Sequence, residues 1–326
     1  MPEAGKTSPD AETLAAPRVP DTLSLLLDDI HFEGVVLRQV ELHAPWALHL
    51  HTPGLTAVHI VTRGRAVLER AGCAPLVVGT GDILVLPSGD AHDLHDVGTP
   101  KVASAIDLLP ELGRVQPEPL HVGGGTGEAT SLWSGHFRFD IDMARPLIRA
   151  LPRLIHQRAI GSTPPAWLQH GLRFVAEETA RPLPGQQAIF NHIADIVLVE
   201  TLRDYVESLP EGAGNWLLAL RDRALSTTLA AMHRNPAHDW SVPELAELAN
   251  LSRSSFAERF TVVLGQPPLS YLTEHRMRLA THLLRHSRLS VAQVAERVGY
   301  GSETAFGQAF KRQYGLPPSQ ARNAED

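Results

Sequence analysis

The sequence predicts an α+β protein of several domains, with an N-terminal antiparallel β-barrel, a helical linker and a C-terminal all-α domain that contains one two-helix unit twice. Three observations predict this class. Short apolar runs separated by turn residues fill the first part of the chain. Apolar residues spaced three and four apart follow, and the C-terminal part repeats one helical pattern. The 326 residues are enough for two or three domains that each bury a core.

The start of the chain shows no targeting segment. Residues 1–20 are rich in Pro and Ala and lack the cationic start and apolar stretch of a signal peptide, so we expect a disordered leader. No apolar run approaches the roughly 20 residues that cross a bilayer. Cys73 is the only cysteine, which excludes an intrachain disulfide and favours a reducing compartment. We therefore expect a cytoplasmic protein with no membrane contact.

Residues 21–143 are predicted to form the barrel. Runs such as GVVLRQVEL, AVHIVTRGRAVLE and DILVLPSGD alternate with Pro and Gly, which is typical of an antiparallel β-sandwich or barrel. Cys73 falls in this apolar strand context, where a thiol is usually inert. An oxidant-sensing role for Cys73 is therefore the less favoured alternative.

Residues 144–215 are predicted to form the helical linker, because apolar spacing indicates helices near residues 144–158, 167–179 and 186–209. The last of these helices has an apolar band that is wider than a single docking face requires. We expect this helix to join two copies of the chain into a homodimer, which would raise the affinity for a two-part site on a partner.

Residues 216–326 differ from the rest of the chain in charge. They carry 13 Lys and Arg against 10 Asp and Glu, whereas the remainder carries 16 against 26. The net charge of −7 therefore conceals a weakly cationic C-terminal domain, which is compatible with a nucleic-acid partner.

The repeat in this domain starts at two serines. SVPELAELA begins at Ser241 and SVAQVAERV begins at Ser290, and Glu244 and Gln293 complete a capping box in each. Breaks follow at residues 250–251 and 299–300. Each break predicts the start of a second helix.

The second helices match one another as well. Ser252 and Ser302 are the expected N-caps. An aromatic pair follows in each helix, Phe256 with Phe260 and Phe306 with Phe310, and both helices stop at Gly-x-Pro-Pro. A short helix, a tight turn and a second helix with one buried face form a helix-turn-helix unit, whose second helix can enter the DNA major groove.

Residues 268–287 predict one long helix between the two units, with Leu272, Leu279, Ala280, Leu283 and Leu284 packing against both. A rigid spacer of this kind suits two adjacent major-groove segments on one face of double-stranded DNA, about 34 Å apart.

From about residue 217 to residue 322 the sequence resembles the AraC-type transcriptional regulators, most closely in SVAQVAERVGYGSETAFGQAFKRQYGLPPSQ, residues 290–320. The family commonly has Tyr where this chain has Ala321, which we expect to loosen only the final packing. The resemblance implies a regulator of transcription that binds operator or promoter DNA, with RNA polymerase as a further candidate partner.

The positions opposite the Phe pairs are expected to face DNA. Gln308 would read adenine, Glu258 would accept from cytosine and Ala257 would touch a thymine methyl group. Exposed Arg and Lys side chains would meet phosphates. The expected DNA-binding residues are Arg253, Ser254, Ala257, Glu258, Thr261, Ser302, Glu303, Thr304, Gln308, Lys311 and Arg312.

The predicted barrel resembles the cupin family in two motifs. GDILVLPSGDAH, which ends at His92, is similar to the second cupin motif, and His49-Leu-His51 is similar to the first. The metal-binding Glu of the first motif would fall at Thr56 or Ala57, and neither is a carboxylate. Three imidazoles without an anionic ligand would remain for a metal.

Three roles for the barrel remain open: a metal site of His49, His51 and His92, a pocket for an organic ligand, and a structural or dimer-supporting barrel. We favour the organic-ligand pocket and expect no cofactor and less than one metal ion per chain. The ligand-pocket candidates are His49, His51, His59 and His92.

The sequence therefore predicts a DNA-binding transcriptional regulator whose barrel senses a small molecule or a chemical stress. One alternative is a constitutive dimeric DNA-binding protein with a structural barrel, which unchanged operator affinity across a broad ligand screen would favour. Another is a metal-dependent cupin enzyme. The missing Glu and the DNA-binding pattern count against an enzyme, and no Gly-x-Ser-x-Gly motif occurs.

Overall fold

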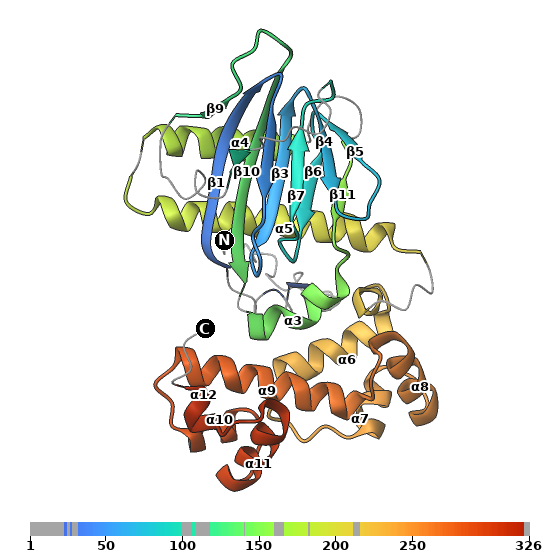
Figure 1. Cartoon of the computed structure of the whole chain (residues 1–326). Helices are drawn as coiled ribbons and strands as arrows, with labels where there is room; N and C mark the ends of the chain where they lie inside the picture. The colour runs from blue at the N-terminus through green and yellow to red at the C-terminus, as the bar shows by residue number, and fades with distance from the viewer. Residues whose placement is uncertain are drawn as a thin grey trace, which may run out of the picture. The chain divides into compact units, whose positions relative to one another are not determined.

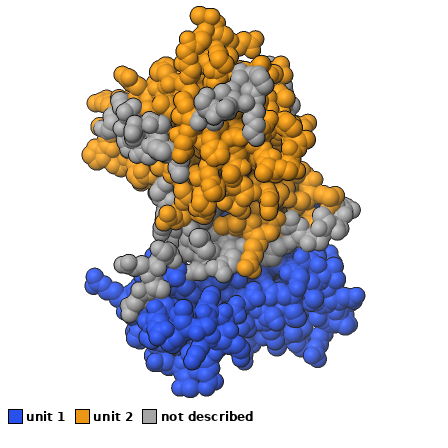
Figure 2. Space-filling view, in the orientation of Figure 1, with its two compact units in different colours: residues 1–28, 219–326 blue, residues 29–218 orange. Residues whose placement is uncertain are grey.

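The computed structural model describes residues 32–98, 106–108, 118–139, 141–159, 166–181, 183–210 and 216–322, together with residues 23, 24 and 27. These residues fall into two compact units, one spanning residues 29–218 and the other including residues 219–326 (Figure 2). The expected leader, residues 1–20, lies outside the described residues. Within the described ranges, no helix combines the length and the apolar character needed to span a membrane.

The N-terminal unit is built from two β-sheets (Figure 1). The larger sheet has the strand order β11-β6-β3-β10-β1-β9, and the smaller has the order β5-β4-β7-β2-β8. The strands are β1 (Phe32–His43), β2 (Ala47–Leu50), β3 (Thr56–Arg63), β4 (Arg65–Arg70), β5 (Leu76–Gly79), β6 (Ile83–Leu86), β7 (His92–His95), β8 (Ile106–Asp107), β9 (Leu120–Val122), β10 (Ala129–Phe139) and β11 (Ile155–Gln157).

Both sheets contribute aliphatic side chains to one core. Leu42 and Leu132 come from the larger sheet, Leu48 and Leu68 come from the smaller one, and all four are buried in the same cluster. Successive side chains of a strand point to opposite faces, so each strand supplies alternate residues to this layer. The apolar runs of the sequence therefore fill the space between the sheets.

The expected antiparallel β-structure is present, but within the described residues the strands do not close into a barrel. The two sheets are open, and two of the strand pairs, β1 with β9 and β2 with β8, are parallel. A barrel closes only when its edge strands pair in a continuous ladder. The edge strands β5, β8, β9 and β11 have only four, two, three and three residues, too few to extend a ladder from one sheet to the other.

Three helices belong to the same unit: α3 (Ile141–Ala150), α4 (Ala166–Ala180) and α5 (Gln186–Ser208). Helix α5 packs against β1, β11 and α4. The expected helix over residues 144–158 is wrong in its last part, where β11 pairs with β6. Pro152 explains the break, because the residue before a proline avoids the helical conformation. The backbone of Ile155 then pairs with Val85.

The described residues of the C-terminal unit form helices, and the 3-10 turn η1 (Trp216–Leu220) spans the boundary between the two units. Two helix pairs, α7 with α8 and α10 with α11, share the long helix α9, which contacts α8, α10, α11 and α12. The helices are α6 (Arg223–Arg234), α7 (Val242–Leu248), α8 (Arg253–Leu264), α9 (Pro268–His286), α10 (Val291–Arg297), α11 (Glu303–Tyr314) and α12 (Pro318–Ala321).

The predicted starts of both first helices are confirmed. In α7 the Ser241 hydroxyl accepts from the Glu244 backbone N–H, and the Glu244 carboxylate accepts from the Ser241 backbone N–H. Helix α10 has the same capping box between Ser290 and Gln293. These contacts satisfy N–H groups that the first turn of a helix leaves without a partner, which explains why two short seven-residue helices form here.

Candidate nucleic-acid interface

Helix α8 has one buried face. The Ser252 hydroxyl caps its N-terminus, and Gly265, at a φ of 74°, ends it in the left-handed conformation that glycine adopts without strain. Phe256 and Phe260 are fully buried, with ring centroids 5.6 Å apart. Leu264 continues the same face. This packing fixes which side of α8 is left for a partner.

The opposite side of α8 carries the residues that the sequence places at DNA. Arg253, Ser254, Glu258 and Thr261 are exposed, and Ala257 is half-buried. Sequence reasoning missed Val262, which is 70% exposed. Its position four residues after Glu258 puts it on the same side of the helix, and this spacing could have identified it. An exposed valine beside polar side chains can contact a thymine methyl group.

Helix α11 repeats this arrangement. Phe306, Ala309 and Phe310 are buried, and Gly315 ends the helix at a φ of 78°. The Ser302 hydroxyl accepts from the Ala305 N–H, so this expected DNA-binding residue also serves as the N-cap. The exposed side chains are Ser302, Glu303, Thr304, Gln308, Lys311 and Arg312.

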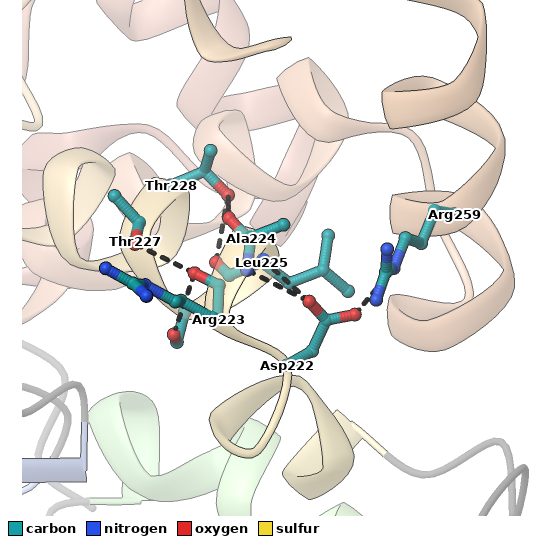
Figure 3. Close-up of polar contacts among 8 residues, drawn as sticks. Asp222, Arg223, Ala224, Leu225, Thr227, Thr228 and Arg259 are labelled. Atoms are coloured by element: carbon teal, nitrogen blue, oxygen red, sulfur yellow. Dashed lines mark hydrogen bonds and ion pairs between the residues drawn. The ribbon is translucent and has the colours of Figure 1, made fainter. Parts of the chain in front are cut away.

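An ion pair anchors α8 to the start of α6. One carboxylate oxygen of Asp222 accepts from the backbone N–H groups of Ala224 and Leu225, which caps α6. The other oxygen accepts from Nε of Arg259 on α8, 2.6 Å away (Figure 3). The Asp222 side chain is only 13% exposed, whereas that of Arg259 is 50% exposed. The pair therefore holds α8 by its flank and leaves its outer face open.

The second helix pair, α10 with α11, packs on the C-terminal half of α9. Ala280 and Leu284 of α9 share a core cluster with Val294 and Phe306, and Ala321 of α12 is buried in it. Leu279 and Leu283 are only partly buried against this cluster. The small side chain of Ala321, where the resembling family commonly has Tyr, therefore still contributes to the packing.

Two of the histidines that the sequence singles out meet inside the N-terminal unit. Nε2 of His59 lies 2.7 Å from Nε2 of His92, and both rings are buried. Nδ1 of His59 is 2.6 Å from the Ser134 hydroxyl, and Nδ1 of His92 is 2.7 Å from the carbonyl oxygen of Asp90. The structure therefore places a polar chain of four residues within the apolar interior.

The protonation of this chain follows from its end. The Asp90 carbonyl can only accept, so Nδ1 of His92 carries a proton and its Nε2 accepts from His59. Nδ1 of His59 then accepts from the Ser134 hydroxyl. Burial lowers the pKa of both imidazoles, and the pKa of His59 falls well below its ordinary value, with the proximity of His92 acting in the same direction. Both rings are therefore neutral near pH 7.

The hypothetical metal site of His49, His51 and His92 is wrong in its geometry. Strand pairing sets Leu50 opposite His92 and His49 opposite Asp93, so His49 and His92 point to opposite faces of the smaller sheet. Nδ1 of His49 is 2.7 Å from the Asp93 carboxylate, and His51 is exposed. Within the described residues no group of three or more His, Cys, Asp or Glu side chains could hold a metal ion.

Cys73 also differs from its expected setting. It is exposed in the turn between β4 and β5, not within an apolar strand.

Comparison with known proteins finds one family model in the N-terminal part of the chain and another in the C-terminal part. Residues 21–207 match the cupin family model, and residues 245–324 match a helix-turn-helix domain model. The chain is 37% identical to the HTH-type transcriptional regulator AlkR of Acinetobacter baylyi over 93% of this chain and 99% of that protein. It is 35% identical to a putative AraC-like transcription regulator of Streptomyces lividans over 93% and 96%.

A solved structure of the DNA-binding domain of AdpA in complex with a target DNA is similar over a shorter stretch. The identity is 34%, the match covers 29% of this chain and 86% of that chain, and the TM-score is 0.29.

Proposed function

The chain belongs to the AraC-type DNA-binding transcriptional regulators that carry an N-terminal cupin domain, and from this premise we propose that both of its helix pairs are helix-turn-helix units that read adjacent segments of one operator. The observation that carries the proposal is the repeated build of α8 and α11, each capped by a serine, buried through a Phe pair and exposed on the opposite side. We refer to α8 and α11 as the reading helices. The relatives named above are transcriptional regulators, which speaks against an enzyme.

The exposed side chains divide by chemistry into two roles. Arg253, Lys311 and Arg312 are cations that suit phosphates. The base edges are left to the polar and small side chains, which are Ser254, Ala257, Glu258, Thr261, Glu303, Thr304 and Gln308. Ser302 would add its backbone or its hydroxyl at the start of α11, where helix N–H groups attract a phosphate.

We expect residues 217–326 to fold and bind DNA when produced alone, because this stretch has its own core and its own helix caps. With three phosphate contacts, raising the salt from about 50 to 200 mM should weaken binding about 40-fold. A gel-shift titration on a duplex that the full-length protein selects from a random library measures this. Lys311→Gln should lower the slope of log affinity against log salt by about one.

A salt response that is flat for this fragment would contradict the proposal. The same slope for Lys311→Gln and the parent would remove Lys311 from the phosphate contacts and leave the rest of the assignment standing.

We also propose that the N-terminal unit senses a small molecule or a chemical stress. Burying the hydrogen-bonded chain that contains His59 and His92 costs free energy in an apolar core, and such a chain suits a site with two states. Operator affinity that stays constant across a broad ligand screen would favour the constitutive alternative.

We further propose a homodimer through α5. Ile196 of α5 is 53% exposed, although the opposite face of this helix is buried within the unit. Sedimentation that shows a monomer at micromolar concentration would exclude it.

A further inference from the structure

The two helix pairs touch at a place other than α9. Residues 235–240 connect α6 to α7, and Gly299 lies in the turn between α10 and α11. Gly299 has a φ of 82°, and a Cβ atom built on it would lie 2.7 Å from the carbonyl oxygen of Ala237. Only glycine combines this conformation with so close an approach. The connection of the first pair therefore lies directly against the turn of the second pair.

Arg276 of α9 also binds residues 235–240, the connection between α6 and α7. Its Nε donates to the carbonyl oxygen of Pro236 at 2.6 Å, and its Nη2 donates to the carbonyl oxygen of His238 at 2.7 Å. A planar guanidinium with two donors in fixed directions orients both acceptors at once, which a lysine cannot do. Arg276 is half-buried between the buried neighbours His275 and Met277. Arg276 therefore makes both contacts from the middle of α9.

The phenol of Tyr300, next to Gly299 in the chain, lies near the same guanidinium. Its ring packs against Phe306 of α11, with centroids 5.6 Å apart. Arg276, Ala237 and Gly299 therefore join the connection before α7, the middle of α9 and the turn before α11. We call this group of three residues the clamp.

We propose that Arg276 is a positioning residue that fixes the separation of the two reading helices and so determines which operator spacing the protein accepts. If α9 were the only connection between the two helix pairs, each pair could still tilt relative to α9. The clamp adds a second connection away from the α9 axis, and two separate connections remove this freedom. The inference rests on the proposed function, because it requires both helices to read DNA.

Operator spacing tests the inference. From the duplex that the wild-type protein selects, two derivatives are made with one base pair inserted or deleted between the two contacted segments. One base pair moves the second segment by about 3.4 Å and rotates it by roughly 35°. We expect the full-length wild-type protein to bind both derivatives at least tenfold more weakly than the parent duplex. Arg276→Met should bind the parent duplex more weakly and reduce the penalty for either derivative to less than threefold.

Three further variants make the result specific. Arg276→Lys keeps the charge but not the paired donors, and its spacing penalty should fall between those of Met and wild type. Gly299→Ala pushes against Ala237, and it should also reduce the penalty while leaving Arg276 in place. Arg288→Met, which removes an exposed cation from the loop between α9 and α10, should leave the penalty at its wild-type value.

The ratio of affinities, not the affinity itself, is the readout, so a moderate loss of stability does not affect the answer. If Arg276→Met does not fold, Arg276→Lys and Gly299→Ala carry the test. If the wild-type protein selects no duplex from the random library, the proposed function is overturned. A wild-type protein that ignores spacing, or clamp variants that keep the full penalty, would overturn the role of Arg276 and leave DNA binding intact.

Discussion

Ser254→Asp and, separately, Gln308→Asp are expected to weaken operator binding at least tenfold, which corresponds to about 1.4 kcal/mol. Both side chains are exposed on the outer faces of the reading helices. A new carboxylate there would meet phosphates and base edges rich in acceptors. We expect the larger loss at Ser254, because it lies in the first turn of α8, and the N-terminal residues of a recognition helix lie deepest in the groove.

Neither change should disturb the fold. Surface substitutions usually alter stability by no more than about 0.5 kcal/mol. Ser254 is the second residue of α8, where a carboxylate is favourable for the helix N-terminus. Equilibrium binding and thermal unfolding measured on the same samples separate the two effects, and the unfolding midpoint should barely move.

Ser319→Asp is the matched control. Ser319 is also exposed and is also the second residue of a helix, but it lies on α12 rather than on a reading helix. It should leave operator affinity unchanged. Parental affinity in both test variants would show that the outer faces are assigned wrongly, and unfolding of both would show that these residues belong to the core.

The N-terminal unit is expected to lose stability as the pH falls below about 6.5. Burial lowers the pKa of His59 and His92 in the folded state from an ordinary value near 6.5. Below pH 6.5 the unfolded chain therefore binds protons that the folded chain does not bind, and protons favour unfolding. Full stability is present above pH 6.5 and declines until the lowered pKa values are reached.

The size of this effect follows from the number of histidines held neutral. Each histidine that stays neutral in the folded state contributes at most about 1.4 kcal/mol per pH unit below its unfolded pKa, until its lowered folded pKa is reached. Burial also lowers the pKa of His136 in the same unit, which adds to the effect. In a Trp240→Phe background the remaining tryptophans, among them the buried Trp46 and Trp133, lie in the N-terminal unit, and urea unfolding followed by their fluorescence measures the free energy at each pH.

A pair of glutamine variants identifies the source. His59→Gln removes one titrating ring from the chain, so its unfolding free energy should depend less steeply on pH, even if it is lower throughout. His51→Gln changes an exposed ring and should match the wild type. An unchanged pH dependence in His59→Gln would mean that the buried pair does not control the acid response.

The two repeated helix pairs and the long helix between them could be predicted from the sequence because their signals are local. Ser241 with Glu244 and Ser290 with Gln293 lie within one helical turn, and the structure contains both capping boxes. The Phe pairs also pack as their four-residue spacing predicts. Arg259 and Arg276 could not be assigned in this way, because their partners lie 37, 40 and 38 residues away in the chain.

The N-terminal unit was less predictable because strand register is a long-range property. The alternation along β2 places His49 and Leu50 on opposite faces, but only the pairing of Leu50 with His92 shows that His92 faces inward. His59 and His92 are both among the expected ligand-pocket residues, but their contact spans 33 residues, and no local spacing indicates that the two rings meet. Strand β11 was mistaken for helix because three residues carry too little periodicity to distinguish the two.

Methylation interference on the selected duplex tests the central claim most directly, since methylation at guanine N7 blocks contacts in the major groove. The account predicts two clusters of interference on one face of the DNA, with centres one helical turn or about 10 base pairs apart. Ser254→Asp should weaken one cluster and Gln308→Asp the other. A single cluster, or the same cluster affected by both variants, would contradict a protein that reads DNA with α8 and α11 together.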